Sequence, residues 1–195
     1  YIIASNPLDV MCRICLKLAK CNPTKIIGTG TLLDTNRLFS ILGEKYNKSM
    51  FDIHGYVLGE HGSTSFVNWT SLNINVPNNE RDEINNKVRR IGLEIVDKLG
   101  FTAYGVSSAL LKITKCIEED KRELLPVSTY LKDYDIFIST PSVIGKKGVY
   151  ENNKVTFDEV EKLEFEKSVN KIKKEVKKLT FRELVGKNNY CKTKS

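Results

Sequence analysis

The order of helical and strand patterns in the second half of the chain limits the possible folds more than any other feature. From Glu80 to Leu99 apolar residues recur every three or four positions, which predicts an amphipathic helix. Gly100 ends this helix, and a second helix is expected over Thr102 to Glu119. Three antiparallel strands joined by short turns should follow, over 124–131, 135–140 and 143–150. Because helices and strands come in separate runs, the order predicts an α+β fold and not strict βαβ alternation.

The first half of the chain opens with a strand, a helix and a second strand. Ile2 to Ala4 is predicted to be the end of a buried strand. Asn6-Pro7 should open a helix that runs to about Lys20, because asparagine caps free amides and proline suits the first helical turn. Lys25 to Gly28 is predicted as the second short strand, and after a turn another helix should extend to about Tyr46.

Two further strands and a last helix complete the expected elements. One strand is predicted over 52–58, where apolar residues alternate, and one over 66–76, which is rich in β-forming residues. Thr156 and Glu159 have the spacing of a capping box, so the last helix should begin there and reach about Leu179. The tail after Gly186 is polar and is expected to fray.

Composition and charge argue against several classes of function. No apolar run approaches the roughly 18 residues that cross a bilayer, so we expect no membrane segment. The net charge of +7 raises the question of nucleic acid. However, the densest lysine run, Lys171 to Lys178, alternates with Ile172 and Val176 at helical spacing. We interpret it as the solvated face of a helix and expect no nucleic-acid partner.

The five cysteines favour a reducing compartment. Their odd number, in a chain of 195 residues, argues against a disulfide scaffold. Cys12 and Cys15 form a C-x-x-C pair in the first predicted helix, but no second Cys or His pair follows at zinc-ribbon spacing. We therefore expect buried free thiols, no metal site and a cytoplasmic location.

His61 is the first candidate for chemistry. It lies between Gly59 and Gly62, directly after a predicted strand, where glycines permit a tight turn and a close backbone approach. An imidazole in such a turn titrates near neutral pH and can transfer a proton. On spacing alone, an ordinary histidine in a surface loop is the favoured alternative.

Asp34 and Arg37 lie three positions apart on the second predicted helix and therefore share one face. A carboxylate can hold a histidine in one tautomer and stabilise its cation. An arginine can bind a carboxylate ligand through two parallel hydrogen bonds. A local ion pair on a solvated helix face is the simpler interpretation, and nothing in the spacing places the pair beside His61.

Four blocks of sequence, taken together, resemble a known family. They are SNPLDV at 5–10, GTGTLLDTNR at 28–37, GEHG at 59–62 with Trp69 following, and STPSVIGKKG at 139–148. In this order they resemble the signature blocks of the lactate/malate dehydrogenase family, and among its members the L-lactate dehydrogenases. The resemblance covers essentially the whole chain. It implies an α+β substrate-binding, catalytic domain over 29–195, preceded over 1–28 by the last strand–helix–strand of a Rossmann dinucleotide-binding domain.

The resemblance also implies a role for each matching residue. His61 matches the catalytic histidine that exchanges a proton with the substrate, Asp34 its carboxylate partner, and Arg37 the arginine that binds the substrate carboxylate. The further substrate-binding positions are Asn6, Asp9 and Thr102. The positions that meet the nicotinamide end of NAD are Ala4, Ser5, Asn6, Thr29 and Val106.

The implied reaction is the interconversion of (S)-lactate and pyruvate by hydride transfer with NAD, as in glycolysis and pyruvate fermentation. The implied assembly is a homo-oligomer, a tetramer or a dimer. Glu60 favours lactate, because many malate enzymes have glycine there, but malate and 2-hydroxyisocaproate stay open as substrates. Two other classes also stay open: a non-catalytic assembly domain and, less favoured, a nucleic-acid module whose binding would weaken steeply with salt.

The chain departs from the family pattern in several places. The glycine-rich cofactor turn and the mobile loop that closes over the substrate are not found in these residues, so we expect the chain alone to be inactive. Ser63-Thr64 stands where the family has Asp-Ser, and the stretch from Ile74 to Gly100 is short. His54 matches an effector histidine of members activated by fructose 1,6-bisphosphate, but Phe39 replaces the effector arginine. A structural role for His54 is therefore favoured over bisphosphate activation.

Overall fold

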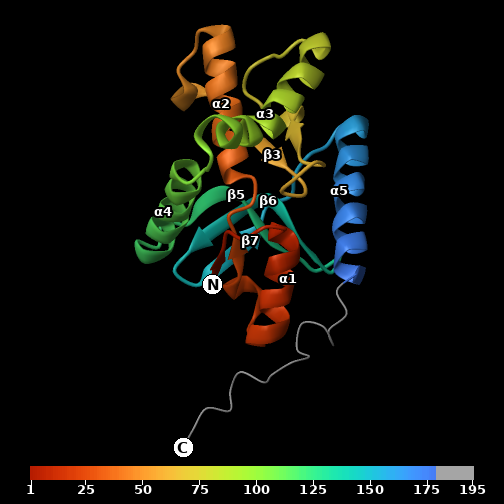
Figure 1. The fold of residues 1–195 in the computed structure, drawn as a ribbon. Coiled ribbons are helices and arrows are strands. Elements are labelled where there is room, and N and C mark those ends of the chain that lie inside the picture. The colour runs from red at the N-terminus through yellow and green to blue at the C-terminus, as the bar shows by residue number, and fades with distance from the viewer. Residues whose placement is uncertain (179–195) are drawn as a thin grey trace, which may run out of the picture.

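The computed structural model describes residues 1–178, except the side chains of Leu93 and Leu99. It contains a five-stranded sheet in the order β1-β2-β5-β6-β7 and a separate two-stranded sheet of β3 and β4 (Figure 1). The strands are β1 Ile2–Ile3, β2 Ile27–Gly28, β3 Tyr56–Leu58, β4 Phe66–Asn68, β5 Glu123–Leu131, β6 Ile136–Gly145 and β7 Gly148–Asn152. The helices are α1 Leu8–Ala19, α2 Leu32–Tyr46, α3 Asn78–Leu99, α4 Tyr104–Glu118 and α5 Glu159–Lys178.

The large sheet is mixed, which confirms the predicted α+β class. β1 and β2 are parallel, with Ile3 opposite Gly28, and α1 forms the crossover between them. The other pairs in this sheet are antiparallel, and β2 joins them through Gly28 and Ser128. The expected strand–helix–strand unit is therefore present and continues into the rest of the sheet. A domain boundary between residues 28 and 29 stays a prediction.

The central hairpin of β5 and β6 corrects one expectation. The strands predicted over 135–140 and 143–150 are divided elsewhere, because β6 runs without a break through 141 and 142 and turns at 146–147. Pro141 lies directly opposite Pro126, so the two residues without an N–H group share one rung of the ladder. The Pro141 carbonyl accepts a hydrogen bond from the Asn153 amide (2.9 Å). Pairing across the sheet thus overrides the local turn signal of the proline.

The strands predicted over 52–58 and 66–76 are much shorter than expected. Met50–Asp52 and Trp69–Ser71 are 3₁₀ turns, and β3 and β4 keep only three residues each. In the first turn the Phe51 amide donates to Ser49 Oγ (3.3 Å), and in the second Ser71 Oγ donates to the Asn68 carbonyl (2.7 Å). These serine hydroxyls satisfy backbone groups locally and so compete with a longer strand ladder.

Two helix starts also differ from the predictions. Pro7, not Asn6, is the N-cap of α1, the Asn6–Pro7 peptide is cis, and no side chain caps this helix. The predicted capping box of Thr156 and Glu159 is wrong. Instead, the Glu161 amide donates to Asp158 Oδ1 (2.8 Å) and the Asp158 amide to Glu161 Oε2 (3.0 Å). The expected helix end at Leu179 and the tail after Gly186 lie outside the described residues.

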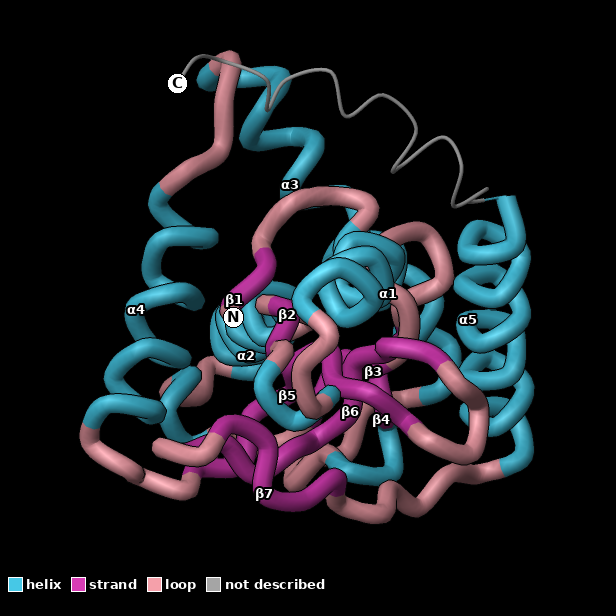
Figure 2. Tube along the Cα trace, turned by 90° about the horizontal axis from the view of Figure 1, so that it is seen from below, coloured by secondary structure: helices cyan, strands magenta, loops and turns pink. Residues whose placement is uncertain are grey.

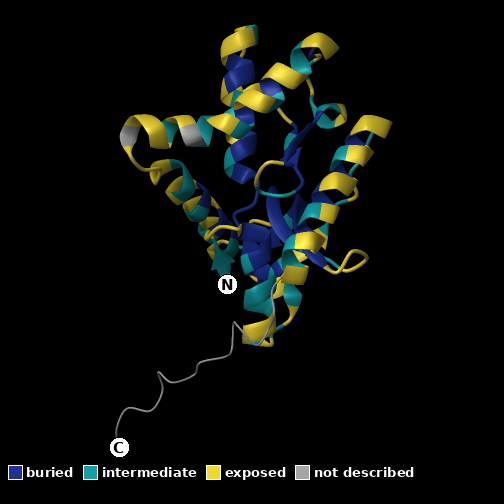
Figure 3. Cartoon of the chain, turned by 45° about the vertical axis from the view of Figure 1, so that its right-hand side comes forward, coloured by how far each residue is buried: buried dark blue, intermediate teal, exposed yellow. Residues whose placement is uncertain are grey.

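The helices bury their apolar faces against the two sheets. α4 and α5 lie on opposite sides of the molecule with the large sheet between them (Figure 1 and Figure 2). Ile113 and Cys116 of α4 pack on β5 and β6, whereas Phe165 and Ile172 of α5 pack on β3, β4 and β6. Along both helices the buried residues face inward and the exposed residues face outward (Figure 3). Within residues 1–178, no helix is both long enough and apolar enough to cross a membrane.

Candidate active site

The turn after β3 carries His61 and is fixed to the large sheet. The amide and the carbonyl of Gly59 both bond to Ser139 of β6, each at 3.1 Å. Gly59 has φ +95°, and a Cβ there would lie 2.5 Å from Ser168 Oγ of α5, so this position requires glycine. Glu60 accepts from the Thr64 amide (3.0 Å) and pairs with Lys171 of α5 (2.9 Å). The turn that carries His61 is therefore bonded to β6 on one side and to α5 on the other.

The first turn of α2 is held against the same strand. Thr31 Oγ1 donates to the Val57 carbonyl, and the Val57 amide donates to Thr35 Oγ1 (3.0 Å). Gly30, just before the helix, has φ +55°, and a Cβ there would lie 2.4 Å from the Ser128 amide nitrogen of β5. This close contact lets α2 begin directly beside β3 and β5, and it brings Asp34 to the end of β3.

His61, Asp34 and Arg37 form one hydrogen-bonded cluster. The His61 ring nitrogen Nδ1 lies 3.1 Å from Asp34 Oδ2, and Arg37 Nη1 donates to Asp34 Oδ1 at 3.0 Å. The side chains of Asp34 and Arg37 are 11% and 15% exposed, and that of His61 is 26% exposed. The pair on the helix is thus mostly withdrawn from solvent, while the imidazole stays accessible to a ligand. The simpler interpretation of the spacing, an ion pair on a solvated helix face, is therefore wrong.

The surroundings of His61 favour its protonated form. Burial lowers the pKa of the imidazole, but the hydrogen bond and negative charge of Asp34, with the charges of Asp9 and Glu60, outweigh burial and raise it above 6.5. Because a carboxylate only accepts hydrogen bonds, Nδ1 carries a proton in either charge state. The second ring nitrogen, Nε2, is then the atom that can give up or take a proton.

Asp9 approaches the same histidine from the backbone side. It lies in the first turn of α1 and is 2% exposed. The His61 amide donates to Asp9 Oδ2 (2.9 Å), and Ser128 Oγ donates to Asp9 Oδ1 (2.6 Å). Burial raises the pKa of Asp9 to about 6, although these two hydrogen bonds and the charge of His61 act to lower it.

Four of the five predicted cofactor positions lie where the parallel strands β1 and β2 end. Ala4, Ser5 and Asn6 follow β1 and are exposed, and Thr29 follows β2, with its amide bonded to the Ile3 carbonyl (2.9 Å). Ala4 and Ser5 also line a cavity of about 500 Å³ beside α1. Ligands of α/β sheets bind at the carboxyl ends of parallel strands. Small, exposed residues at this edge therefore fit a flat ring such as nicotinamide.

Thr102 and Val106 lie at the start of α4, a helix that packs against α2. They flank the start of α4, where a Cβ on Gly105 would lie 2.9 Å from Leu33 Cδ1. The start of α4 is therefore packed on the first turn of α2, which also carries Asp34. Among the described residues, neither Thr102 nor Asn6 forms a hydrogen bond with His61, so their predicted roles stay predictions.

His54 is separated from the cluster by β3, which lies between it and His61 in the chain. Its ring is exposed, and its backbone pairs with Asn73. Phe39, at the position of the second effector charge, packs against the hydrophobic core of α2 and α3. Among the described residues, no second charge therefore stands at that effector position, which favours the structural interpretation of His54.

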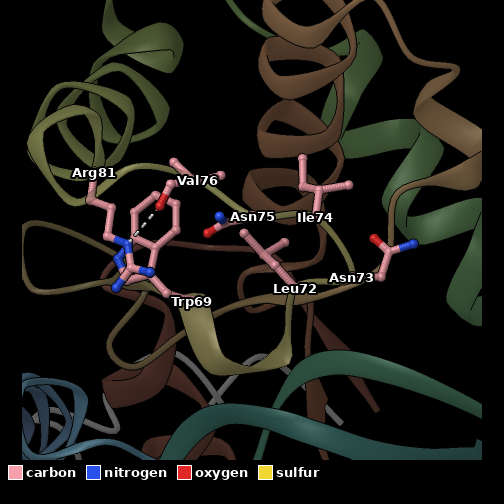
Figure 4. A pocket seen from close by; sticks show the side chains of 7 residues that line it. All are labelled: Trp69, Leu72, Asn73, Ile74, Asn75, Val76 and Arg81. Atoms are coloured by element: carbon pink, nitrogen blue, oxygen red, sulfur yellow. Dashed lines mark hydrogen bonds between the residues drawn. The ribbon is translucent and has the colours of Figure 1, made fainter.

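A cavity of about 310 Å³ lies next to the backbone partner of His54. It is lined by Trp69, Leu72, Asn73, Ile74, Asn75, Val76 and Arg81 (Figure 4). The Arg81 guanidinium lies over the Trp69 ring, 5.4 Å from its centroid, and Nε donates to the Val76 carbonyl (3.2 Å). The Arg81 guanidinium therefore already interacts with Trp69 and Val76. None of the predicted site residues lines this cavity.

Some residues around the site were not identified from the sequence. Ser128 binds Asp9, Lys171 binds Glu60, and Gly92 of α3 leaves room for Arg37, whose Nη1 would lie 3.2 Å from a Cβ there. These three lie far along the chain from the motifs that they support. No spacing rule connects them, so only the folded chain identifies them.

Comparison with known proteins identifies the family of the chain. The family model described as lactate/malate dehydrogenase, alpha/beta C-terminal domain, matches residues 31–182. The chain belongs to the lactate/malate dehydrogenase family. It is 35% identical to an L-lactate dehydrogenase of Borrelia hermsii, over 93% of this chain and 63% of the relative. It is 36% identical to L-lactate dehydrogenase 2 of Clostridium acetobutylicum, over 91% and 61%.

A solved structure gives the same result for the fold. The minor L-lactate dehydrogenase of Enterococcus mundtii in its ligands-bound form matches with a TM-score of 0.88 and 28% identity. The match covers 92% of this chain and 62% of that chain. The chain thus spans less than two thirds of the length of these relatives.

Proposed function

We propose that this chain is the substrate-binding and proton-transfer part of an NAD-dependent L-lactate dehydrogenase, an oxidoreductase that interconverts (S)-lactate and pyruvate. The contact of His61 with Asp34 and Arg37 carries the proposal. It joins a proton donor, a carboxylate that stabilises the donor's cation, and a guanidinium suited to a carboxylate ligand. The names of the relatives support the same reaction.

In the reduction of pyruvate, protonated His61 donates from Nε2 to the ketone oxygen as that oxygen gains negative charge. Asp34 orients the ring through Nδ1 and stabilises the cation that exists before the transfer. In lactate oxidation the same nitrogen accepts the hydroxyl proton. Because the His61 pKa is raised, a larger fraction of the imidazole is protonated at neutral pH and ready to donate.

Arg37 binds the substrate carboxylate in this proposal. In the described part of the chain its side chain makes one hydrogen bond, from Nη1 to Asp34, which leaves the other edge of the guanidinium for a ligand. Two parallel hydrogen bonds there fix the 2-oxo acid with its ketone toward His61. The bond to Asp34 keeps the arginine in this orientation.

The residues at the ends of β1 and β2 would hold the nicotinamide end of NAD. These are Ala4, Ser5, Asn6 and Thr29, together with Val106 of α4. NAD supplies the hydride acceptor and donor when bound. Asn6 would orient the reacting oxygen by a hydrogen bond, and Thr102 would line the substrate pocket.

Kinetics of the full-length protein test the proposal. NADH oxidation should be fastest with pyruvate, compared with oxaloacetate and 2-oxoisocaproate as substrates. Arg37→Lys should raise the KM for pyruvate by at least ~100-fold, because the lysine ammonium cannot form the two parallel hydrogen bonds of the guanidinium. Exposed Lys45→Arg on the same helix is the control and should leave KM unchanged. A higher kcat/KM for either competitor would reject the choice of lactate.

The chain of 195 residues alone should show negligible NADH turnover. Robust turnover would contradict the proposal that these residues supply substrate binding and proton transfer only.

We further propose a homo-oligomer in the cytoplasm. The four cysteines in the described residues are free thiols, which fits a reducing compartment. Activation by fructose 1,6-bisphosphate is not favoured, because Phe39 is part of the core packing.

A further inference from the structure

Asp9 connects three segments that lie far apart in the chain. It belongs to α1, its Oδ2 accepts from the amide of His61 in the turn after β3, and its Oδ1 accepts from Ser128 in β5. With 2% of its surface exposed, it is as buried as the apolar core. Both hydrogen bonds are at normal or short length, so the carboxylate is firmly held.

A carboxylate buried this deeply is costly to ionise, and the raised pKa of Asp9, about 6, shows that cost. A hydrophobic or amide side chain would occupy such a position at a lower cost in desolvation free energy. Together with the charges of Asp34 and Glu60, the charge of Asp9 raises the pKa of the His61 imidazole. The buried charge therefore acts on the histidine that the proposed reaction uses.

We propose that Asp9 is a positioning residue for proton transfer. It holds the main chain of His61 by a hydrogen bond to the backbone amide, while Asp34 holds the ring by a hydrogen bond to Nδ1. The two negative charges together stabilise the imidazolium. This task differs from the direct substrate contact that the resemblance implied for Asp9. The inference rests on the proposed function only in taking His61 as the group that transfers the proton.

The titratable groups around Asp9 determine how its effect on His61 depends on pH. His61 and Glu60 face it from the turn after β3, and Cys12 lies one turn further along α1. Burial first, and then Asp9, raises the pKa of the Cys12 thiol far above neutrality, so that thiol stays uncharged. As the pH falls through about 6, Asp9 is protonated and its support for the imidazolium is lost.

The two histidines of the chain allow a direct test by NMR titration of their ring protons, with exposed His54 as the internal control. In Asp9→Asn the His61 pKa should fall by about 0.5 unit or more, while the ring signals of His54 should match those of the wild type. An unchanged His61 pKa in a folded Asp9→Asn variant would overturn the proposal.

A matched pair of serine variants covers the case in which Asp9→Asn does not fold. Ser128 and Ser139 are direct partners across β5 and β6, and both are fully buried. Ser128 donates to Asp9, whereas Ser139 Oγ has no hydrogen-bond partner within the described residues. Ser128→Ala should lower the His61 pKa, because Asp9 ionises less readily without its donor. Ser139→Ala should not, and equal effects of the two variants would contradict the proposal.

Kinetics of the full-length enzyme separate this inference from the proposed function. Asp9→Asn should lower kcat ~10-fold and leave the KM for the 2-oxo acid within about twofold, because Arg37 is untouched. The acid limb of its pH profile should also move. If no 2-oxo acid is reduced by the wild type, the proposed function fails while the NMR result still decides the role of Asp9. Unchanged kcat and pH profile in an active Asp9→Asn enzyme would refute the positioning role.

Discussion

At the scale of single residues, Asp34 determines the chemistry of the site because its two oxygens bind different partners. One oxygen accepts from His61 and the other from Arg37, so the proton donor and the proposed carboxylate-binding group share one anchor. The residue is 8% exposed, which strengthens both interactions compared with bulk water. Loss of this single carboxylate should therefore affect proton transfer more than loss of any surface charge.

Asp34→Asn should lower the His61 pKa and reduce kcat of the full-length enzyme by at least ~100-fold. The amide loses the charge that stabilises the imidazolium and can present an N–H group to Nδ1, which favours the wrong tautomer. Stopped-flow NADH oxidation across pH measures the effect. Glu44→Gln, an exposed change on the same helix, is the control. Similar kcat values for the two variants would contradict the role of Asp34.

Asp9 should make the free energy of unfolding depend on pH. Its folded pKa, about 6, lies above the ordinary aspartate value of 3.8, so ionisation is harder in the folded state. This group therefore destabilises the fold above pH 6 and is neutral below about pH 4. The rise from 3.8 to about 6 corresponds to roughly 3 kcal/mol.

Urea unfolding of wild type and Asp9→Asn between pH 4 and pH 8 measures this contribution. The stability of Asp9→Asn relative to wild type should rise as the pH increases from about 4 to about 6 and then level off. A difference that is independent of pH would show that Asp9 has an ordinary pKa in the fold.

At the scale of elements, the N-terminus of α5 is tied to the rest of the chain by one buried carboxylate. Glu161 is 2% exposed and accepts from the amide of Asp158 in its own capping box. It also accepts from the amide (2.9 Å) and the hydroxyl (2.8 Å) of Thr70, which follows β4. The start of the helix and the end of the small sheet are thus stabilised together.

Glu161→Ala should reduce the free energy of unfolding by about 2–4 kcal/mol. The change leaves two backbone donors without a partner and removes a helix cap. Glu159→Ala, on the exposed side of the same first turn, should cost less than about 0.5 kcal/mol. Chemical denaturation of both variants measures the difference. Comparable losses would indicate that Glu159, as the sequence pattern suggested, also caps the helix.

At the scale of the whole molecule, the hairpin of β5 and β6 contacts most other elements. β2 and β7 pair with its two edges, and α1, α4, α5 and β3 all contact β6. The paired residues run from Glu123 opposite Ile144 to Leu131 opposite Ile136. The turn that carries His61 is bonded to this hairpin at Ser139, so the site depends on its rigidity.

Hydrogen–deuterium exchange should reflect this arrangement. Amides of β5 and β6 should be the slowest to exchange, because they open only with global unfolding. Amides around 100–103, in the exposed connection between α3 and α4, should exchange early. Equal protection of both segments would contradict the central role of the hairpin. Peptide-resolved mass spectrometry of the native protein can measure this.

Parts of the fold and the site were predictable because they depend on local pattern. The periodicity over 80–99 predicted α3 within two residues of its start, and the helices α2 and α4 were placed similarly well. The strands predicted over 52–58 and 66–76 exist but are much shorter, and the cap predicted at Thr156 was wrong. In each of these, short side-chain hydrogen bonds or contacts from distant residues decided between local alternatives of similar energy.

The sequence by itself determined the class of fold, the presence of the strand–helix–strand unit, and the candidates His61, Asp34 and Arg37. Helical periodicity, glycine positions and the order of signature blocks are properties of neighbouring residues, so they can be read without a structure. Only the tertiary structure decided that these side chains meet, and that Asp9 and Ser128 hold His61 from behind. Such contacts join residues up to 119 positions apart, and no local pattern encodes them.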